Sequence, residues 1–192
     1  MKRILFILMM MISGISLSQS TVNPDTVCYQ SATPSTYTVP SVGTGTYTWT
    51  IKSPGVITAG QGTNSISVDW STASPGLITN GVSVTFTTPA PSSCPADPVT
   101  LNVLIYQVLP SITTAGPFCE TDPCVTLAGT PTGGTWSGTG VVGNQFCPDN
   151  VSNGSNAVSN VTYTVTSGGC TFTSNKTFSV YGKPTLSPIQ HN

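Results

Sequence analysis

Apolar residues alternate with threonine, serine and other polar residues along most of the chain. A two-residue period is typical of half-buried β-strands, and threonine suits the wet face of such a strand because it is both β-branched and polar. Proline- and glycine-rich segments separate the runs as turns. Strands that recur roughly every 10 to 18 residues favour a β-sandwich over alternating strands and helices. The runs lie at residues 36–39, 46–51, 65–70, 82–86, 99–105, 124–127, 134–137, 141–142, 160–165 and 177–181.

The order of features repeats once along the chain. Each half has a cysteine near its start, a Thr-Trp strand (Thr48-Trp49 or Thr135-Trp136), a glycine-rich turn and a later cysteine. We therefore expect an all-β protein with two tandem β-sandwich domains, each small enough to benefit from a disulfide. The expected boundaries are 19–107 for the first domain, 108–112 for a hinge, 113–181 for the second domain and 182–192 for a proline-rich linker or tail.

The first 18 residues have the pattern of a secretory signal peptide. Lys2 and Arg3 give a positive start and residues 4–12 form an apolar core. Ser16 and Ser18 supply small side chains at the −3 and −1 positions of a cleavage site. The apolar core is shorter than the roughly 20 residues needed to span a bilayer. We therefore expect residues 1–18 to be removed and the mature chain to have no membrane span. Its expected location is extracellular or on the outer cell surface.

Charged residues are scarce, since 5 Lys+Arg and 6 Asp+Glu make up only 6% of the chain, against roughly 25% in an average globular protein. Solubility must come largely from the 24 serines and 32 threonines. Without a basic patch to neutralise phosphates, nucleic-acid binding is not expected. The single histidine is the penultimate residue, His191, so a serine nucleophile has no suitably placed histidine base. We therefore expect a protein that is not an enzyme.

All six cysteines follow the expected signal peptide, and an even number in an oxidising compartment predicts three disulfides. Cys28 and Cys94 are the only possible pair within the first expected domain. The four cysteines of the second domain allow three connectivities. No Cys-x-x-Cys pair is present, so we do not expect a metal site built on these residues. The connectivity that we favour in the second domain is Cys119–Cys170 with Cys124–Cys147.

Two parts of the chain resemble known repeat modules. Residues 46–51 (TYTWTI) and 60–70 (GQGTNSISVDW) resemble the PKD-like domain of large surface proteins from gliding, type IX-secreting Gram-negative bacteria. Residues 127–141 (LAGTPTGGTWSGTGV), with 163–165 and 168–171, resemble an Ig-like repeat of the same proteins. The second resemblance is the more specific, because the matching run of residues is long and its residues occur in a fixed order.

The resemblance implies a PKD-like β-sandwich at 19–107 and an Ig-like β-sandwich at 113–181, as tandem modules of an adhesin or a gliding-associated filament. It implies no catalytic residues. We therefore expect a non-enzymatic extracellular module that forms part of a surface adhesin, stalk or filament. Its partners would be other β-sandwich modules or copies of itself. The alternative is a carbohydrate-binding module of a secreted polysaccharide-processing system, which would bind surface glycans.

Three places could carry chemistry. Trp70 could present an aromatic platform to a sugar, although a tryptophan in a sandwich more often packs in the core. Thr26 lies in an Asp-Thr-Val sequence that resembles the O-glycosylation site of the same type of bacterium. Glu120, Asp122 and Asp149 could converge as a weak calcium site, because calcium prefers oxygen ligands. Their spacing matches no calcium-loop signature, so we expect solvated loop charges and no cofactor.

Overall fold

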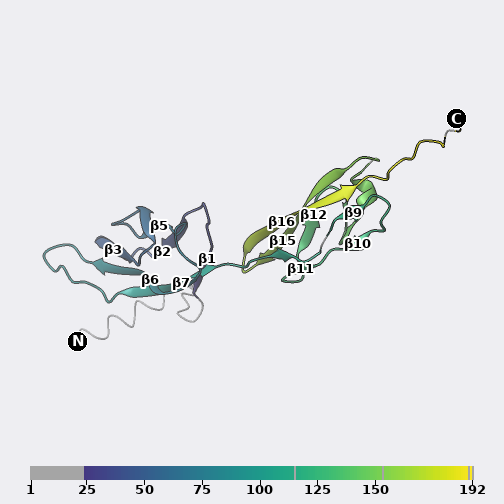
Figure 1. Ribbon diagram of the computed structural model, residues 1–192. Coiled ribbons are helices and arrows are strands. Elements are labelled where there is room, and N and C mark those ends of the chain that lie inside the picture. Colours follow the sequence, from purple (N-terminus) through teal and green to yellow (C-terminus); the bar gives the residue numbers. More distant parts are fainter. Residues whose placement is uncertain (1–23, 115, 153, 190, 192) are drawn as a thin grey trace. The chain divides into compact units, whose positions relative to one another are not determined.

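The computed structural model describes residues 24–114, 116–152, 154–189 and 191, so the expected signal peptide at 1–18 lies outside the described residues. Within them, the regular structure consists of β-strands and one 3-10 turn at Pro148–Asn150. None of the helical structure in these ranges is long and apolar enough to cross a membrane. The all-β prediction is therefore confirmed for this part of the chain (Figure 1).

The chain divides into two compact units, which we describe separately. Residues 33–72 and 77–104 form the first, together with Pro24 and Asp25. The second contains residues 26–32, residues 73–76 and the described residues from Ile105 onward. The division into tandem domains at 108–112 stays a prediction.

Strands β1 to β7 form two sheets, and their alternating patterns are those seen in the sequence. In β3, for example, Tyr47 and Trp49 are buried and the threonines between them are exposed. Trp49 lies opposite the buried Val84 of β6, which places both in the core. One sheet has the order β1 (Asp25–Cys28), β7 (Val99–Tyr106), β6 (Gly76–Thr87), β3 (Thr46–Ile51); the other has the order β2 (Ser35–Thr38), β5 (Ser65–Asp69), β4 (Val56–Ala59).

The second unit is built from shorter strands around an aromatic core. Phe118, Phe146 and Phe178 contact one another, with ring centroids 5.0 to 5.4 Å apart. One sheet has the order β12 (Thr135–Ser137), β15 (Ala157–Ser167), β16 (Cys170–Tyr181), β9 (Phe118–Cys119). The others are β10 (Val125–Thr126), β14 (Gln145–Phe146), β13 (Val141–Val142), and the pair β11 (Gly129–Thr130), β8 (Ser111–Ile112).

The glycine-rich string at 127–141 folds around one buried tyrosine. The Tyr163 hydroxyl donates to the Pro131 carbonyl (2.5 Å) and accepts from the Gly134 amide (2.9 Å). A Cβ on Gly129 or Gly134 would lie 2.6 Å from the Tyr163 ring, so both positions need glycine. The Trp136 ring packs on the same tyrosine, with centroids 4.2 Å apart. The segment 127–141, which carries the Ig-like resemblance, therefore packs closely around the Tyr163 side chain.

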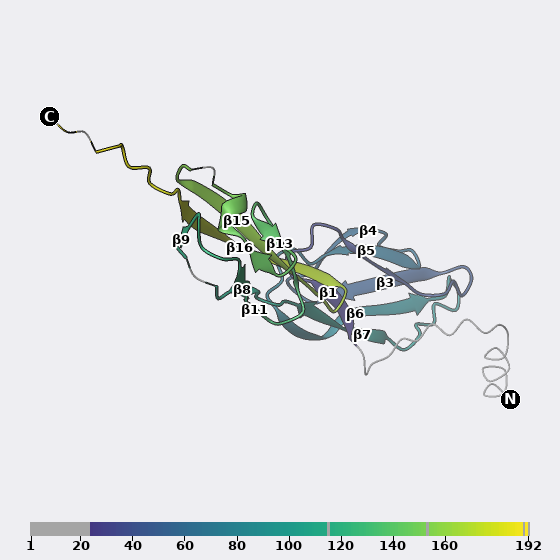
Figure 2. The same cartoon turned by 90° about the vertical axis from the view of Figure 1, so that its right-hand side faces the viewer.

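Strands β15 and β16 form one long hairpin, visible in two orientations (Figures 1 and 2). Their pairing is continuous from Ala157 opposite Val180 to Ser167 opposite Cys170. Gly168 and Gly169 form the turn with φ of 59° and 77°. Two positive φ values are what a two-residue hairpin turn of type I′ requires, and they favour glycine at both positions.

Candidate functional site

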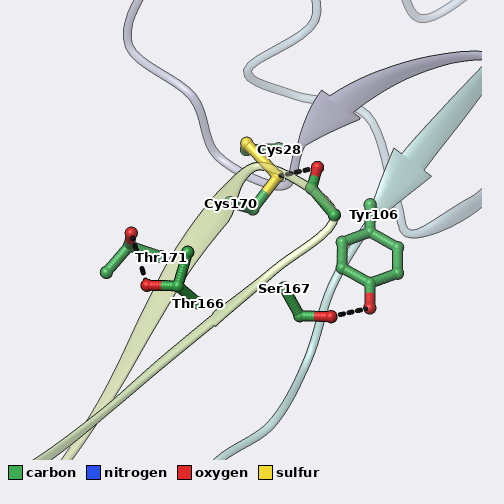
Figure 3. Close-up of a disulfide and its surroundings, with 7 residues drawn as sticks. Cys28, Tyr106, Thr166, Ser167, Cys170 and Thr171 are labelled. Atoms are coloured by element: carbon green, nitrogen blue, oxygen red, sulfur yellow. Dashed lines mark hydrogen bonds between the residues drawn. A yellow bond between two sulfur atoms is a disulfide. The ribbon is translucent and has the colours of Figure 1, made fainter. Parts of the chain in front are cut away.

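The disulfide between Cys28 and Cys170 joins the first strand to the turn of the last hairpin (Figure 3). Their Cα atoms are 5.5 Å apart although they are 142 positions apart in the sequence. The Tyr29 amide, directly after β1, donates to the Tyr106 carbonyl at the end of β7 (2.9 Å). The two strands therefore end side by side and run parallel, which brings Cys28 to the C-terminal end of β7.

The expected Cys28–Cys94 and Cys119–Cys170 pairs are wrong, and strand direction explains both. Cys94 precedes β7, whose 8 residues separate it from the end where Cys28 lies, a span of about 26 Å. Cys119 pairs in parallel with Tyr181 at the far end of β16 from Cys170. Cys94 and Cys119 are both free and exposed.

Tyr106 holds the hairpin turn in place beside this disulfide (Figure 3). Its hydroxyl is 2.8 Å from the Ser167 hydroxyl. Its ring lies 3.0 Å from where a Cβ of Gly168 would be, so only glycine fits there without displacing the ring. Its centroid is also 6.1 Å from that of Phe172. Sequence reasoning missed this contact, because Tyr106 is distant in the chain from Ser167, Gly168 and Phe172.

The second disulfide joins Cys124 to Cys147, the pairing expected from the sequence. Both sulfur atoms and the Asp149 carboxylate lie within 4.8 Å of one another, which is a metal-ligand spacing. Because the sulfurs are bonded to each other, they are not available as thiolate ligands. The cluster therefore acts as a covalent clip between two loops.

The three acidic residues considered for calcium line one pocket of about 680 Å³ together with Lys183. The Glu120 carboxylate accepts from the backbone amides of Gly154 (2.9 Å) and Lys183 (3.0 Å). The Asp122 carboxylate accepts from the Cys119 amide (2.7 Å). These bonds hold loops together and use both Glu120 oxygens and one Asp122 oxygen as acceptors. That these carboxylates hold no calcium stays a prediction, and we derive no chemistry from them.

Trp70 does not present a platform, because it is 3% exposed. Its indole N–H donates to the Tyr37 hydroxyl (3.1 Å), which in turn donates to the Asp25 carboxylate (2.9 Å). Burial raises the pKa of the Tyr37 hydroxyl above its usual value, and the negative charge of Asp25 raises it further. The three side chains form a polar chain in the first unit, with the tryptophan as a core residue.

Thr26 is the exposed residue of β1, between the half-buried Asp25 and the buried Val27. The Asp25 carboxylate is engaged with Tyr37, so the threonine hydroxyl is the accessible group of the Asp-Thr-Val sequence. An extended, exposed threonine is open to enzymatic glycosylation. O-glycosylation at Thr26 stays a prediction.

The comparisons with known proteins bear on the first part of the chain. The family model of the PKD-like domain matches residues 16–91. No curated protein matches the sequence. The matched segment contains β1 to β6 of the two sheets described above, including both core tryptophans of that part, Trp49 and Trp70. Residues 16–91 are therefore similar to the PKD-like domain.

Proposed function

We propose that this protein is a non-enzymatic structural module of the extracellular space, a segment of a surface adhesin, stalk or filament. The PKD-like match and the disulfide-bonded all-β units support this proposal. Disulfides persist in oxidising compartments outside the cytosol. Glu120 and Asp122, two of the few acidic residues, bond backbone amides and so have a structural role in the loops.

The observation that carries the proposal is the position of the Cys28–Cys170 bond in the chain. A pulling force applied outside these two residues passes through the disulfide, because a covalent bond is much stronger than folded structure. Residues 33–72 and 77–104 of the first unit lie inside the covalent loop, as does the Cys124–Cys147 clip. The loop therefore shields them from tension, a property suited to a module that transmits force.

Contacts with other modules or copies would need an open strand edge, and β3 is not one. The Gln61 side chain accepts from the Trp49 amide (3.1 Å) and donates to the Trp49 carbonyl (2.9 Å), as a neighbouring strand would. The Gly62 carbonyl accepts from the Tyr47 amide. Covered edges prevent uncontrolled pairing. Self-association would therefore use a different edge, such as β2 or β4 of the second sheet.

Labelling of intact producing cells tests the location. Antibodies against the purified mature protein, detected by immunogold electron microscopy, should label the outer surface without permeabilisation. Label that is found only after permeabilisation would overturn the proposal. A fraction secreted into the medium, with both disulfides found by peptide mapping, would support it.

A further inference from the structure

One face of the β12–β15–β16 sheet is a continuous field of uncharged polar side chains. Strand alternation points every second residue outward, and neighbouring strands bring these residues into rows. We call this surface the hairpin face. Its outward residues are Thr135 and Ser137 of β12, Val158, Asn160, Thr162, Thr164 and Thr166 of β15, and Thr171, Thr173, Asn175, Thr177, Ser179 and Tyr181 of β16.

Hydrogen bonds across the two long strands fix the side chains in the middle of the hairpin face. The Thr162 hydroxyl donates to the Asn175 amide oxygen, and the Thr177 hydroxyl donates to the Asn160 amide oxygen, each at 2.7 Å. Both bonds use the oxygen, so the two amide NH2 groups remain free to donate to a ligand. Side chains that are already ordered lose less conformational freedom on binding.

The hairpin face carries no charged side chain among its described residues. Lys176 is the charged residue of these strands, and it lies between two outward residues of β16, facing the other way. Its ammonium group donates to the Thr114 carbonyl (2.7 Å). A ligand on this face would therefore meet hydroxyls, amides and methyl groups without an ionic partner.

An aromatic ring stands at one end of the hairpin face. Tyr181 is 49% exposed, and the nearby Val158 is 67% exposed. A shallow pocket of about 230 Å³ lies between them, lined by Asn156, Ser179 and their neighbours. A second pocket, of about 320 Å³, is also lined by Tyr181, together with Pro117 and Lys176. The exposed ring is thus flanked by two hollows with polar and apolar walls.

We propose that the hairpin face binds an extended neutral glycan, with one sugar ring stacked on Tyr181. A pyranose offers an apolar C–H face to an aromatic ring and hydroxyls to amides and hydroxyls, which matches the composition of this surface. A neutral glycan needs no ionic partner, and the outward side chains of the hairpin face are uncharged. The ammonium group of Lys176, which lines the second pocket, is engaged by the Thr114 carbonyl. Sites of this kind combine an apolar contact with a few placed polar groups. This role goes beyond the structural role proposed above and can fail without affecting it.

Affinity gel electrophoresis of the full mature chain in gels containing a soluble neutral glucan, mannan or galactan tests the proposal. The wild type should be retarded by at least one of the three. Tyr181→Ala should weaken that binding by roughly 5- to 10-fold, whereas Tyr181→Phe should keep it, because the ring remains. Val142→Ala is the matched control, since Val142 is 56% exposed on a different sheet of the same unit and should not matter.

Circular dichroism melting of each variant separates lost binding from lost folding. Because Tyr181 is largely exposed, Tyr181→Ala should melt close to the wild type. Failure of the wild type to bind any of the three polysaccharides would overturn the proposal, and so would unchanged binding by Tyr181→Ala. Retardation restricted to an anionic polysaccharide and abolished by salt would contradict it as well.

Discussion

Reducing the Cys28–Cys170 disulfide should convert an almost inextensible protein into one that lengthens by hundreds of ångströms under force. The separation of 142 residues corresponds to about 500 Å of extended chain. A Cys28→Ser/Cys170→Ser variant keeps the Cys124–Cys147 clip, which withholds 23 residues, so its gain should be about 420 Å. The fully reduced protein should therefore lengthen by about 80 Å more than this variant, and that extra length measures the contribution of the Cys124–Cys147 disulfide.

Single-molecule force spectroscopy measures these lengths directly, with handles at the two ends of the mature chain. The oxidised wild type should gain no more than about a few tens of ångströms before rupture, because the strands outside the loop are already extended. A Cys94→Ser/Cys119→Ser variant is the control, because both thiols are free and exposed. If the oxidised wild type lengthens by several hundred ångströms, force does not pass through this bond and the reasoning is wrong.

Three further predictions concern the polar chain and the candidate sites. Tyr37→Phe should lower the free energy of unfolding by about 1–3 kcal/mol in urea titrations, because it leaves the buried Trp70 indole N–H without an acceptor and removes the bond to Asp25. The raised pKa of Tyr37 means that the folded state holds this proton more tightly than the unfolded state. The wild type should therefore lose stability as the pH rises above about 10, and Tyr37→Phe should lose less; equal slopes would contradict this explanation. Mass spectrometry of the native protein should find a glycan on Thr26 that is absent after Thr26→Ala, and an unmodified wild type would refute the motif assignment. Millimolar calcium should leave the melting temperature unchanged, since both Glu120 oxygens already accept backbone amides; a clear rise would revive the calcium site.

The sequence predicted strands well where apolar and hydroxyl residues alternate strictly. Residues 46–51 and 99–105 were expected as strands and coincide with β3 and most of β7. The long hairpin was only partly foreseen, since 160–165 and 177–181 were expected as separate short strands. The middle of β16 contains Ser174, Asn175 and Lys176, which have little β-propensity of their own. Their partners in β15 impose the strand there.

The disulfide connectivity and the location of Trp70 could not be predicted in the same way. Both depend on which strands are neighbours and in which direction they run. Nothing local in the sequence indicates that β1 runs parallel to β7, yet this direction decides that Cys28 meets Cys170 and not Cys94. Trp70 follows a strand in a segment that could be exposed, but in the fold its ring packs close to Gly55 and its indole N–H bonds the Tyr37 hydroxyl.

Strand β16 connects the two proposals. In the oxidised protein, tension enters this strand at Cys170 and leaves it beyond Tyr181. A β-strand rises about 3.3–3.4 Å per residue, within roughly 10% of the longest span that a chain can reach. The strand can therefore transmit force without unfolding any other element. The outward residues of this same strand form one edge of the hairpin face, so a glycan bound at Tyr181 would be anchored directly on the element under tension.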